Sequence, residues 1–248
     1  MKLIILVIGI TVVCMVFFLI KRHNMHNSKV FPLYRSLHWG GEAEMEKWLA
    51  TGGNVNITDE NGNTPLYYAV GYAGKIYDPT NFTGTKRAVS KKTINLLLEK
   101  GANVNVKNNN GATPIYRSFG SGTTQILLDQ GAILNTQDND GDTPLHAAVL
   151  GRYSSDLDLL LEKGANVNAQ NKKARTPLHI LVITSFFDSN FVDTDFEKKR
   201  DLAIAQNLLT YGSNVNLRDN DGKTPLMLAQ ERGFTEMVNL LKSAGATE

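Results

Sequence analysis

Histidines are the first residues in this 248-residue sequence that could do metal or acid–base chemistry. There are five of them, His23, His26, His38, His146 and His179. None belongs to an HExxH pattern, and none lies in a short Cys/His cluster of the kind that binds zinc. The spacing therefore predicts no metal site and no histidine-based catalysis.

A second candidate is the acidic stretch Asp138–Asp142, which reads DNDGD and resembles the start of a calcium-binding loop. In such a loop the glycine is the sixth residue and a glutamate is the twelfth. Here the glycine comes fourth, and Asp59–Gly62 and Asp219–Gly222 repeat that spacing. These stretches are predicted to be turns. Gly120–Gly122 completes no nucleotide-binding pattern, so we expect no enzyme, cofactor or small-molecule substrate.

Composition narrows the classes of partner. The formal net charge is +2, with 26 basic and 24 acidic residues. That balance lacks the basic excess of a surface that binds nucleic-acid phosphates. The single cysteine, Cys14, cannot form an internal disulfide, so the redox compartment stays open.

The N-terminal segment 3–20 contains 18 residues without a charge. As a helix it would be about 27 Å long, close to the hydrocarbon thickness of a bilayer. We expect one N-terminal transmembrane helix. A cleaved signal and a lipoprotein signal ending at Cys14 are the alternatives. Lys21 and Arg22 follow and favour a cytoplasmic body by a narrow charge bias, with a periplasmic or extracytoplasmic body as the alternative. Residues 21–30 read as a polar linker.

The rest of the chain is built on a repeated pattern with a period of about 33 residues. Thr-Pro-Leu or Thr-Pro-Ile begins five copies, at Thr64, Thr113, Thr143, Thr176 and Thr224, and Phe31-Pro32-Leu33 begins a degenerate first copy. A leucine pair and then a glycine follow in nearly every copy. Threonine caps a helix whose first residue is proline, and glycine ends the helix that follows.

This pattern resembles the ankyrin repeat, most clearly at Thr143–Ala148, which reads TPLHAA. The resemblance covers residues 31–248 in about six copies. It implies an all-α solenoid of helix-turn-helix units with β-hairpin fingers, stacked so that neighbours complete each other's core. It also implies that His146 and His179 make structural hydrogen bonds. Ala174 departs from the pattern, because it replaces a turn glycine.

Two copies carry insertions, near residues 71–91 and 183–200, each expected as a loop between the two helices of its repeat. Exposed aromatic side chains often anchor interfaces. We therefore predict that the partner-binding candidates are the aromatic residues of these insertions: Tyr72, Tyr77, Phe82, Phe186, Phe187, Phe191 and Phe196.

Together these features predict a non-catalytic protein–protein interaction module held at a membrane. The alternative is a bacterial immunity protein, possibly an envelope lipoprotein, that neutralises a cognate toxin or effector. Either way the partner is another protein, and neither nucleic acid nor a small-molecule substrate is expected.

Overall fold

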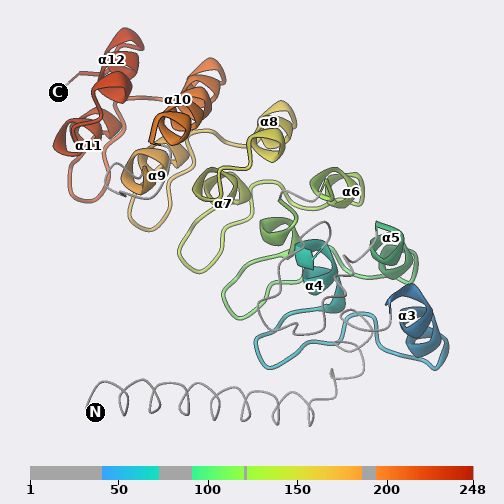
Figure 1. The fold of residues 1–248 in the computed structure, drawn as a ribbon. Helices are drawn as coiled ribbons and strands as arrows, with labels where there is room; N and C mark the ends of the chain where they lie inside the picture. The colour runs from blue at the N-terminus through green and yellow to red at the C-terminus, as the bar shows by residue number, and fades with distance from the viewer. Residues whose placement is uncertain (1–40, 73–90, 120–121, 186–193, 248) are drawn as a thin grey trace, which may run out of the picture.

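The structure is a computed structural model, and it describes residues 41–72, 91–119, 122–185 and 194–247 (Figure 1). The described residues form α-helices and one 3-10 helix. Their bounds, in chain order, are α3 Gly41–Ala50, α4 Pro65–Tyr72, α5 Lys91–Glu99, η2 Pro114–Arg117, α6 Thr124–Asp129, α7 Pro144–Leu150, α8 Ser154–Glu162, α9 Pro177–Thr184, α10 Thr194–Thr210, α11 Pro225–Glu231 and α12 Thr235–Ser243.

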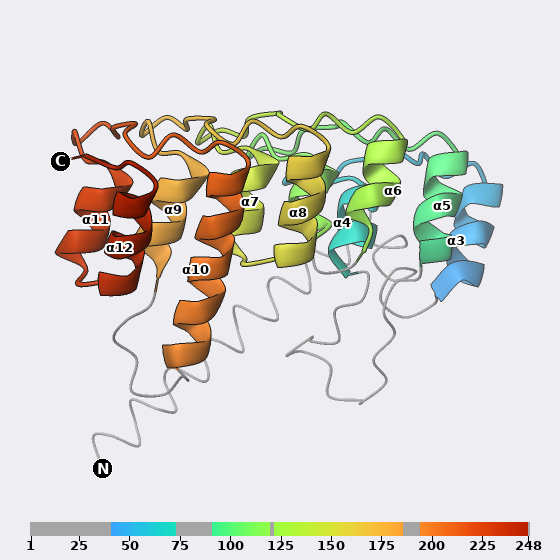
Figure 2. The same ribbon diagram turned by 90° about the horizontal axis from the view of Figure 1, so that it is seen from above.

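The helices stack in two layers (Figures 1 and 2). The helices that follow Thr-Pro lie in one layer, where α4 packs on η2, η2 on α7, α7 on α9 and α9 on α11. The second helices form the other layer. From α5 onward each packs on the first helix of its own repeat, and α3 packs on α5. The predicted all-helical solenoid is confirmed over the described residues.

One continuous apolar core runs between the layers from Met45 to Leu241. In the second to sixth copies, the leucine four residues before the helix-ending glycine has an exposed fraction of 0%: Leu97, Leu127, Leu160, Leu208 and Leu241. A helix pair has too little apolar surface to bury these side chains alone, so each repeat depends on its neighbours.

An asparagine in each repeat links that repeat to the next. The amide of Asn56 donates to the carbonyl of Gly101 at 3.0 Å and accepts from the backbone N–H of Asn103 at 2.8 Å. Asn105 and Asn168 bond in the same way to Gly131 and Gly212. The second asparagine of Gly-Ala-Asn-Val-Asn therefore satisfies a carbonyl at the end of the neighbouring helix.

The fingers are tight turns, and the prediction of β-hairpins was wrong for the described residues, which contain no strand. Adjacent finger tips share one backbone hydrogen bond, such as the 2.9 Å bond from the Asn109 N–H to the Asn61 carbonyl. Within each tip, side-chain oxygens accept some of the other N–H groups, as Asp138 does for Asp140 and Asp142, both at 2.9 Å. Backbone carbonyls of the same turn accept further ones, as that of Asp138 does for Gly141 at 3.1 Å. One backbone bond per pair is too few for a ladder.

The insertions are also shorter than expected. Gly71 and Tyr72 lie in α4, Lys91 in α5, and residues 183–184 in α9. Residues 194–200 form the start of α10, so the interpretation of a loop reaching residue 200 was wrong there. The proposed membrane segment 3–20, the linker 21–30, and residues 73–90 and 186–193 lie outside the described residues.

Candidate functional site

The solenoid has two long edges (Figure 2). We call the row of finger turns the finger edge, and the opposite side, where the two helices of each repeat are joined, the turn edge. Both insertions leave the solenoid at the turn edge, because each joins the first helix of a repeat to the second. The helix α10 extends past its neighbours on this side.

The turn edge exposes large apolar side chains. Phe196, near the start of α10, has an exposed fraction of 61%, and Leu150, the last residue of α7, has one of 55%. Exposed apolar side chains of this size can anchor an interface when they gather on one surface. The turn edge is therefore one candidate for a binding surface.

Arg152 holds the base of the second insertion. Its guanidinium makes two bonds to the Asp201 carboxylate, Nε to Oδ1 at 2.7 Å and Nη2 to Oδ2 at 3.1 Å. Its Nη2 also donates to the Thr184 carbonyl at 2.7 Å. The side chains of Arg152 and Asp201 are 9% and 3% exposed. Because Thr184 ends α9 and Asp201 lies in α10, one buried arginine fixes both sides of the insertion.

A second arginine lies beside the same insertion. Arg232, in the turn after α11, donates from Nη1 to the Ser185 carbonyl at 3.4 Å. Ser185 is buried, and its hydroxyl donates to the Leu181 carbonyl at 2.9 Å. Residues from the repeats on both sides therefore hold the point where the chain leaves α9.

Of the seven predicted partner-binding residues, the structure describes the side chain of one, Phe196, which is exposed as expected. Tyr72 is the last residue of α4, and nothing is described of its side chain. The remaining five lie outside the described residues, as does the predicted lipidation candidate Cys14. Their role in binding therefore stays a prediction.

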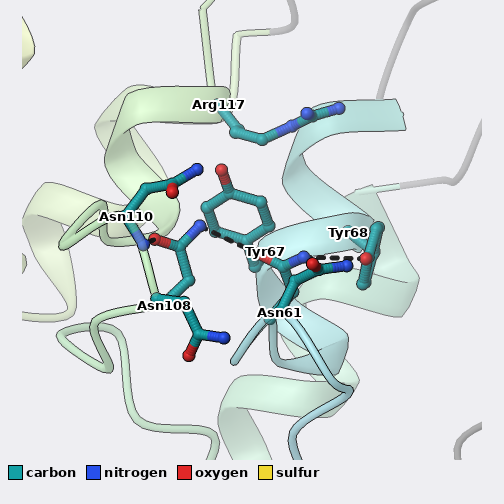
Figure 3. A pocket seen from close by; sticks show the side chains of 8 residues that line it. Asn61, Tyr67, Tyr68, Asn108, Asn110 and Arg117 are labelled. Carbon is teal, nitrogen blue, oxygen red and sulfur yellow. Dashed lines mark hydrogen bonds between the residues drawn. The ribbon is translucent and has the colours of Figure 1, made fainter.

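The finger edge carries a polar hollow of about 240 Å³ between the second and third repeats (Figure 3). Its lining consists of amide, phenol and guanidinium groups, from Asn61, Asn63, Tyr67, Tyr68, Asn108, Asn109, Asn110 and Arg117. The guanidinium carbon of Arg117 lies 5.4 Å from the centre of the Tyr67 ring, a cation–π distance. Motif searching missed this site, because Arg117 and the asparagines belong to no recognised pattern.

The inner wall of the hollow is a chain of hydrogen bonds (Figure 3). The Asn108 amide donates to Asn63 Oδ1 at 2.9 Å, and the Asn63 amide donates to the Tyr68 hydroxyl at 2.8 Å. That hydroxyl donates to Asp59 Oδ2 at 2.6 Å. These bonds satisfy the buried groups and leave the outer rim of the hollow to contact other molecules.

His146 and His179 make the structural hydrogen bonds that the resemblance implied. Nδ1 of His146 lies 2.9 Å from Thr143 Oγ1, and its Nε2 lies 3.0 Å from the Arg175 carbonyl of the next repeat. His179 repeats the arrangement with Thr176 and Lys223. Burial lowers the pKa of both imidazoles below the usual value for histidine.

The third repeat replaces this histidine with Tyr116. Its hydroxyl lies 2.7 Å from the carbonyls of both Thr136 and Asp142, and burial and two nearby carboxylates raise its pKa. In this repeat the N–H of Tyr116 donates to the Thr113 carbonyl at 3.1 Å, and the buried Oγ1 of Thr113 has no partner among the described residues. This repeat also has the 3-10 helix in place of an α-helix.

Two negative findings apply only to the described part of the chain. No group of His, Cys, Asp or Glu side chains there could hold a metal ion. None of the helices in that part is long and apolar enough to cross a membrane. The proposed transmembrane segment was outside this search.

Stacked helix pairs joined by projecting polar turns define a helical repeat protein. A family model for three copies of the ankyrin repeat matches residues 86–171, and a single-repeat ankyrin model matches residues 61–109 and 221–247. Together the matches cover more than half of the chain. The chain belongs to the ankyrin-repeat family, whose repeats bind other proteins and are typically non-catalytic.

One curated relative supports this assignment. Over 44 residues the chain is 57% identical to YahD, named as an ankyrin repeat protein, from Escherichia coli (strain K12). The matched stretch is 18% of this chain and 22% of YahD. It therefore covers about a fifth of either protein.

Proposed function

We propose that this protein is a non-catalytic interaction module, tethered to a membrane through residues 3–20, that binds its partner protein at the turn edge. The main support for this proposal is Phe196. Phe196 is an aromatic side chain, 61% exposed, in the first turn of α10, the helix that extends past its neighbours at the turn edge. Aromatic residues are the class that most often anchors a protein interface.

The buried arginine contacts support the same edge. Because Arg152 binds both the end of α9 and the body of α10, the start of α10 is held in place before any partner arrives. A surface that is ordered in advance loses less conformational entropy on binding. The predicted aromatics of the insertions emerge from the same edge and would enlarge the surface.

Two exposed apolar residues provide a matched test of this edge. Leu150 at the turn edge is 55% exposed, and Ile133 in a finger turn is 57% exposed. The full chain, as wild type, Phe196→Ala, Leu150→Ser or Ile133→Ser, would be crosslinked in its native cells. Captured proteins would then be quantified by mass spectrometry.

Phe196→Ala and Leu150→Ser should each lower recovery of one common protein about tenfold, while Ile133→Ser leaves it unchanged. Loss of that protein with Ile133→Ser alone would contradict binding at the turn edge. The identity of the captured protein decides between the general module and the alternative, because a toxin or effector would make the chain an immunity protein.

Membrane tethering rests on the uncharged segment 3–20, which Lys21 and Arg22 follow. Carbonate-washed membranes should retain the full chain and release a variant that begins at Val30. If the full chain washes off, the tether does not exist. Cys14→Ser separates the lipoprotein alternative, since only an acylated chain would change mobility on losing this thiol. Protease protection of the body in intact cells would show on which side of the membrane it lies.

A further inference from the structure

The hollow at the finger edge has one positive charge and no negative one on its walls. Its lining residues are neutral apart from Arg117. A carboxylate behind the wall, that of Asp59, accepts the N–H groups of Asn61 and Asn63 and the hydroxyl of Tyr68. Three donors thus compensate that charge inside the protein, and the open rim presents an arginine to a ligand.

Arg117 is not required by the repeat. The same place after Thr-Pro holds tyrosine, alanine, isoleucine or leucine in the other described repeats, at Tyr68, Ala147, Ile180 and Leu228. Only the third repeat of these has a cation there. Its side chain is half-buried against α4, where a Cβ on Gly71 would lie 2.5 Å from its Nε. Alanine is normally more favourable than glycine in a helix interior. At position 71, however, glycine leaves room for the guanidinium of Arg117.

The finger tips supply neutral hydrogen-bonding groups beside this charge. Asn61 and Asn110 are exposed, and within the described part of the chain no hydrogen bond is made by either side-chain amide. The corresponding tip residues of the fourth and sixth repeats are Asp140 and Asp221. Two amides therefore stand where carboxylates would repel an anion.

We propose that this hollow binds an aspartate or glutamate side chain from an extended segment of a partner protein. The planar guanidinium of Arg117 matches a carboxylate and can donate two parallel bonds to it. A carboxamide can donate to a backbone carbonyl and accept from a backbone N–H, so Asn61 and Asn110 suit the peptide on either side of the acidic residue. This site lies at the finger edge and does not depend on binding at the turn edge.

The size and lining of the hollow favour a side chain over a small molecule. At about 30 Å³ for each water, 240 Å³ holds roughly eight waters, which is enough for one acidic residue. Pockets for drug-sized ligands and cofactors are larger and mostly apolar. This hollow is smaller and lined mainly by polar groups.

Two substitutions test the arginine in different ways. Arg117→Gln removes the charge and keeps hydrogen-bonding capacity. Gly71→Ala keeps the charge but places a methyl group where the guanidinium lies, while alanine itself suits the helix. Arg218→Gln, an exposed arginine of the sixth repeat, is the matched control.

The full chain in detergent micelles would be used to select twelve-residue peptides from a random phage-displayed library. Peptides bound by the wild type and by Arg218→Gln but lost on Arg117→Gln should share an acidic residue. Fluorescence anisotropy of synthetic copies should show at least tenfold weaker binding to Arg117→Gln and to Gly71→Ala. Replacing the acidic residue by its amide should weaken binding to the wild type equally.

An empty set of arginine-dependent peptides would overturn the proposal, as would a set without an acidic residue. Thermal unfolding of each variant identifies any loss caused by misfolding, and Asn110→Ala at the exposed tip then provides the second measurement. Failure of the turn-edge proposal gives a different result: the crosslinked partner would be insensitive to Phe196→Ala, whatever the peptides show.

Discussion

At the scale of single residues, two non-glycine positions in the described part of the chain adopt the left-handed backbone conformation. Arg152 and Ala174 both have φ of 55°. Ala174 stands in a finger turn where Gly62, Gly111 and Gly141 have φ between 73° and 79°. A side chain with a Cβ costs about 1–2 kcal/mol in this conformation. Ala174 therefore makes the finger turn of the fifth repeat less stable than its neighbours.

Ala174→Gly should raise the free energy of unfolding by about 0.5–1 kcal/mol. Removing the Cβ relieves the backbone strain, and the greater freedom of glycine in the unfolded chain offsets part of that gain. The midpoint of denaturant unfolding should rise at constant m-value. The reverse change, Gly141→Ala, should destabilise, because its Cβ would lie 2.8 Å from the Lys172 nitrogen. Equal midpoints for all three proteins would contradict this account.

The two buried histidines predict a pH dependence of stability. Burial lowers the pKa of His146 and His179 in the folded state, so at mildly acidic pH the unfolded chain binds more protons. Stability should therefore be full above the unfolded pKa of about 6.5 and fall as the pH drops below it. Each histidine contributes at most about 1.4 kcal/mol per pH unit.

The measurement is the free energy of unfolding between pH 7.5 and 5 for the wild type and for the double variant His146→Gln and His179→Gln. The variant should be less stable at pH 7.5 but show a shallower decline. Carboxylates titrate in both proteins, so the difference between the two curves isolates the histidines. Parallel curves would show that other groups cause the decline.

At the scale of elements, the start of α10 was not predicted from the sequence. The charged run at residues 194–200 has no apolar periodicity, and a loop was the natural prediction. In the structure these residues are helical and lead into the part of α10 that contains Asp201. Asp201 binds Arg152, which lies 49 residues earlier in the chain. A contact between two repeats cannot be read from local pattern. The replacement of a turn glycine by Ala174, in contrast, could be recognised from the sequence, because the turn pattern is local.

Arg152→Gln should destabilise the protein by about 3 kcal/mol, because it removes the closer of the two cations that face the buried Asp201 carboxylate and leaves Arg200, whose Nε lies 3.9 Å away. The double variant Arg152→Gln and Asp201→Asn should recover most of that loss, since the carboxylate that lost its closer partner is then neutral. The free energies of unfolding of the wild type, both single variants and the double variant form a double-mutant cycle, which gives the coupling energy of the pair. Strictly additive losses would mean that the pair is not coupled.

At the scale of the whole molecule, the Thr-Pro repeats predicted the solenoid and the capped helices, because both arise from local spacing. The resemblance to the ankyrin repeat implied the histidine bonds. The hollow at the finger edge was not predicted, since it combines Arg117 of one repeat with Asn61 and Tyr67 of the repeat before it. Surfaces of a solenoid form between repeats, and a search within one repeat does not find them. The membrane segment and most insertion aromatics remain predictions.

The solenoid is also least regular at one place. The third repeat has a 3-10 helix of four residues as its first helix and an unpartnered buried threonine hydroxyl among the described residues. The core nevertheless runs through it, because Ile115 and Leu127 are 0% exposed. The repeats on either side unfold together only if the packing of the third repeat against its neighbours is strong enough to couple them.

We predict one cooperative unit. Leu160→Ala or Leu208→Ala removes a side chain with 0% exposure and should cost about 2–5 kcal/mol, while Lys242→Ala at the exposed surface of α12 should cost within about 0.5 kcal/mol. Native-state hydrogen exchange shows which helices lose amide protection in each variant. If the third repeat couples its neighbours, Leu208→Ala lowers the protection of amides in α5 as much as in α12. If protection falls in α12 alone, the chain divides at the third repeat and the prediction fails.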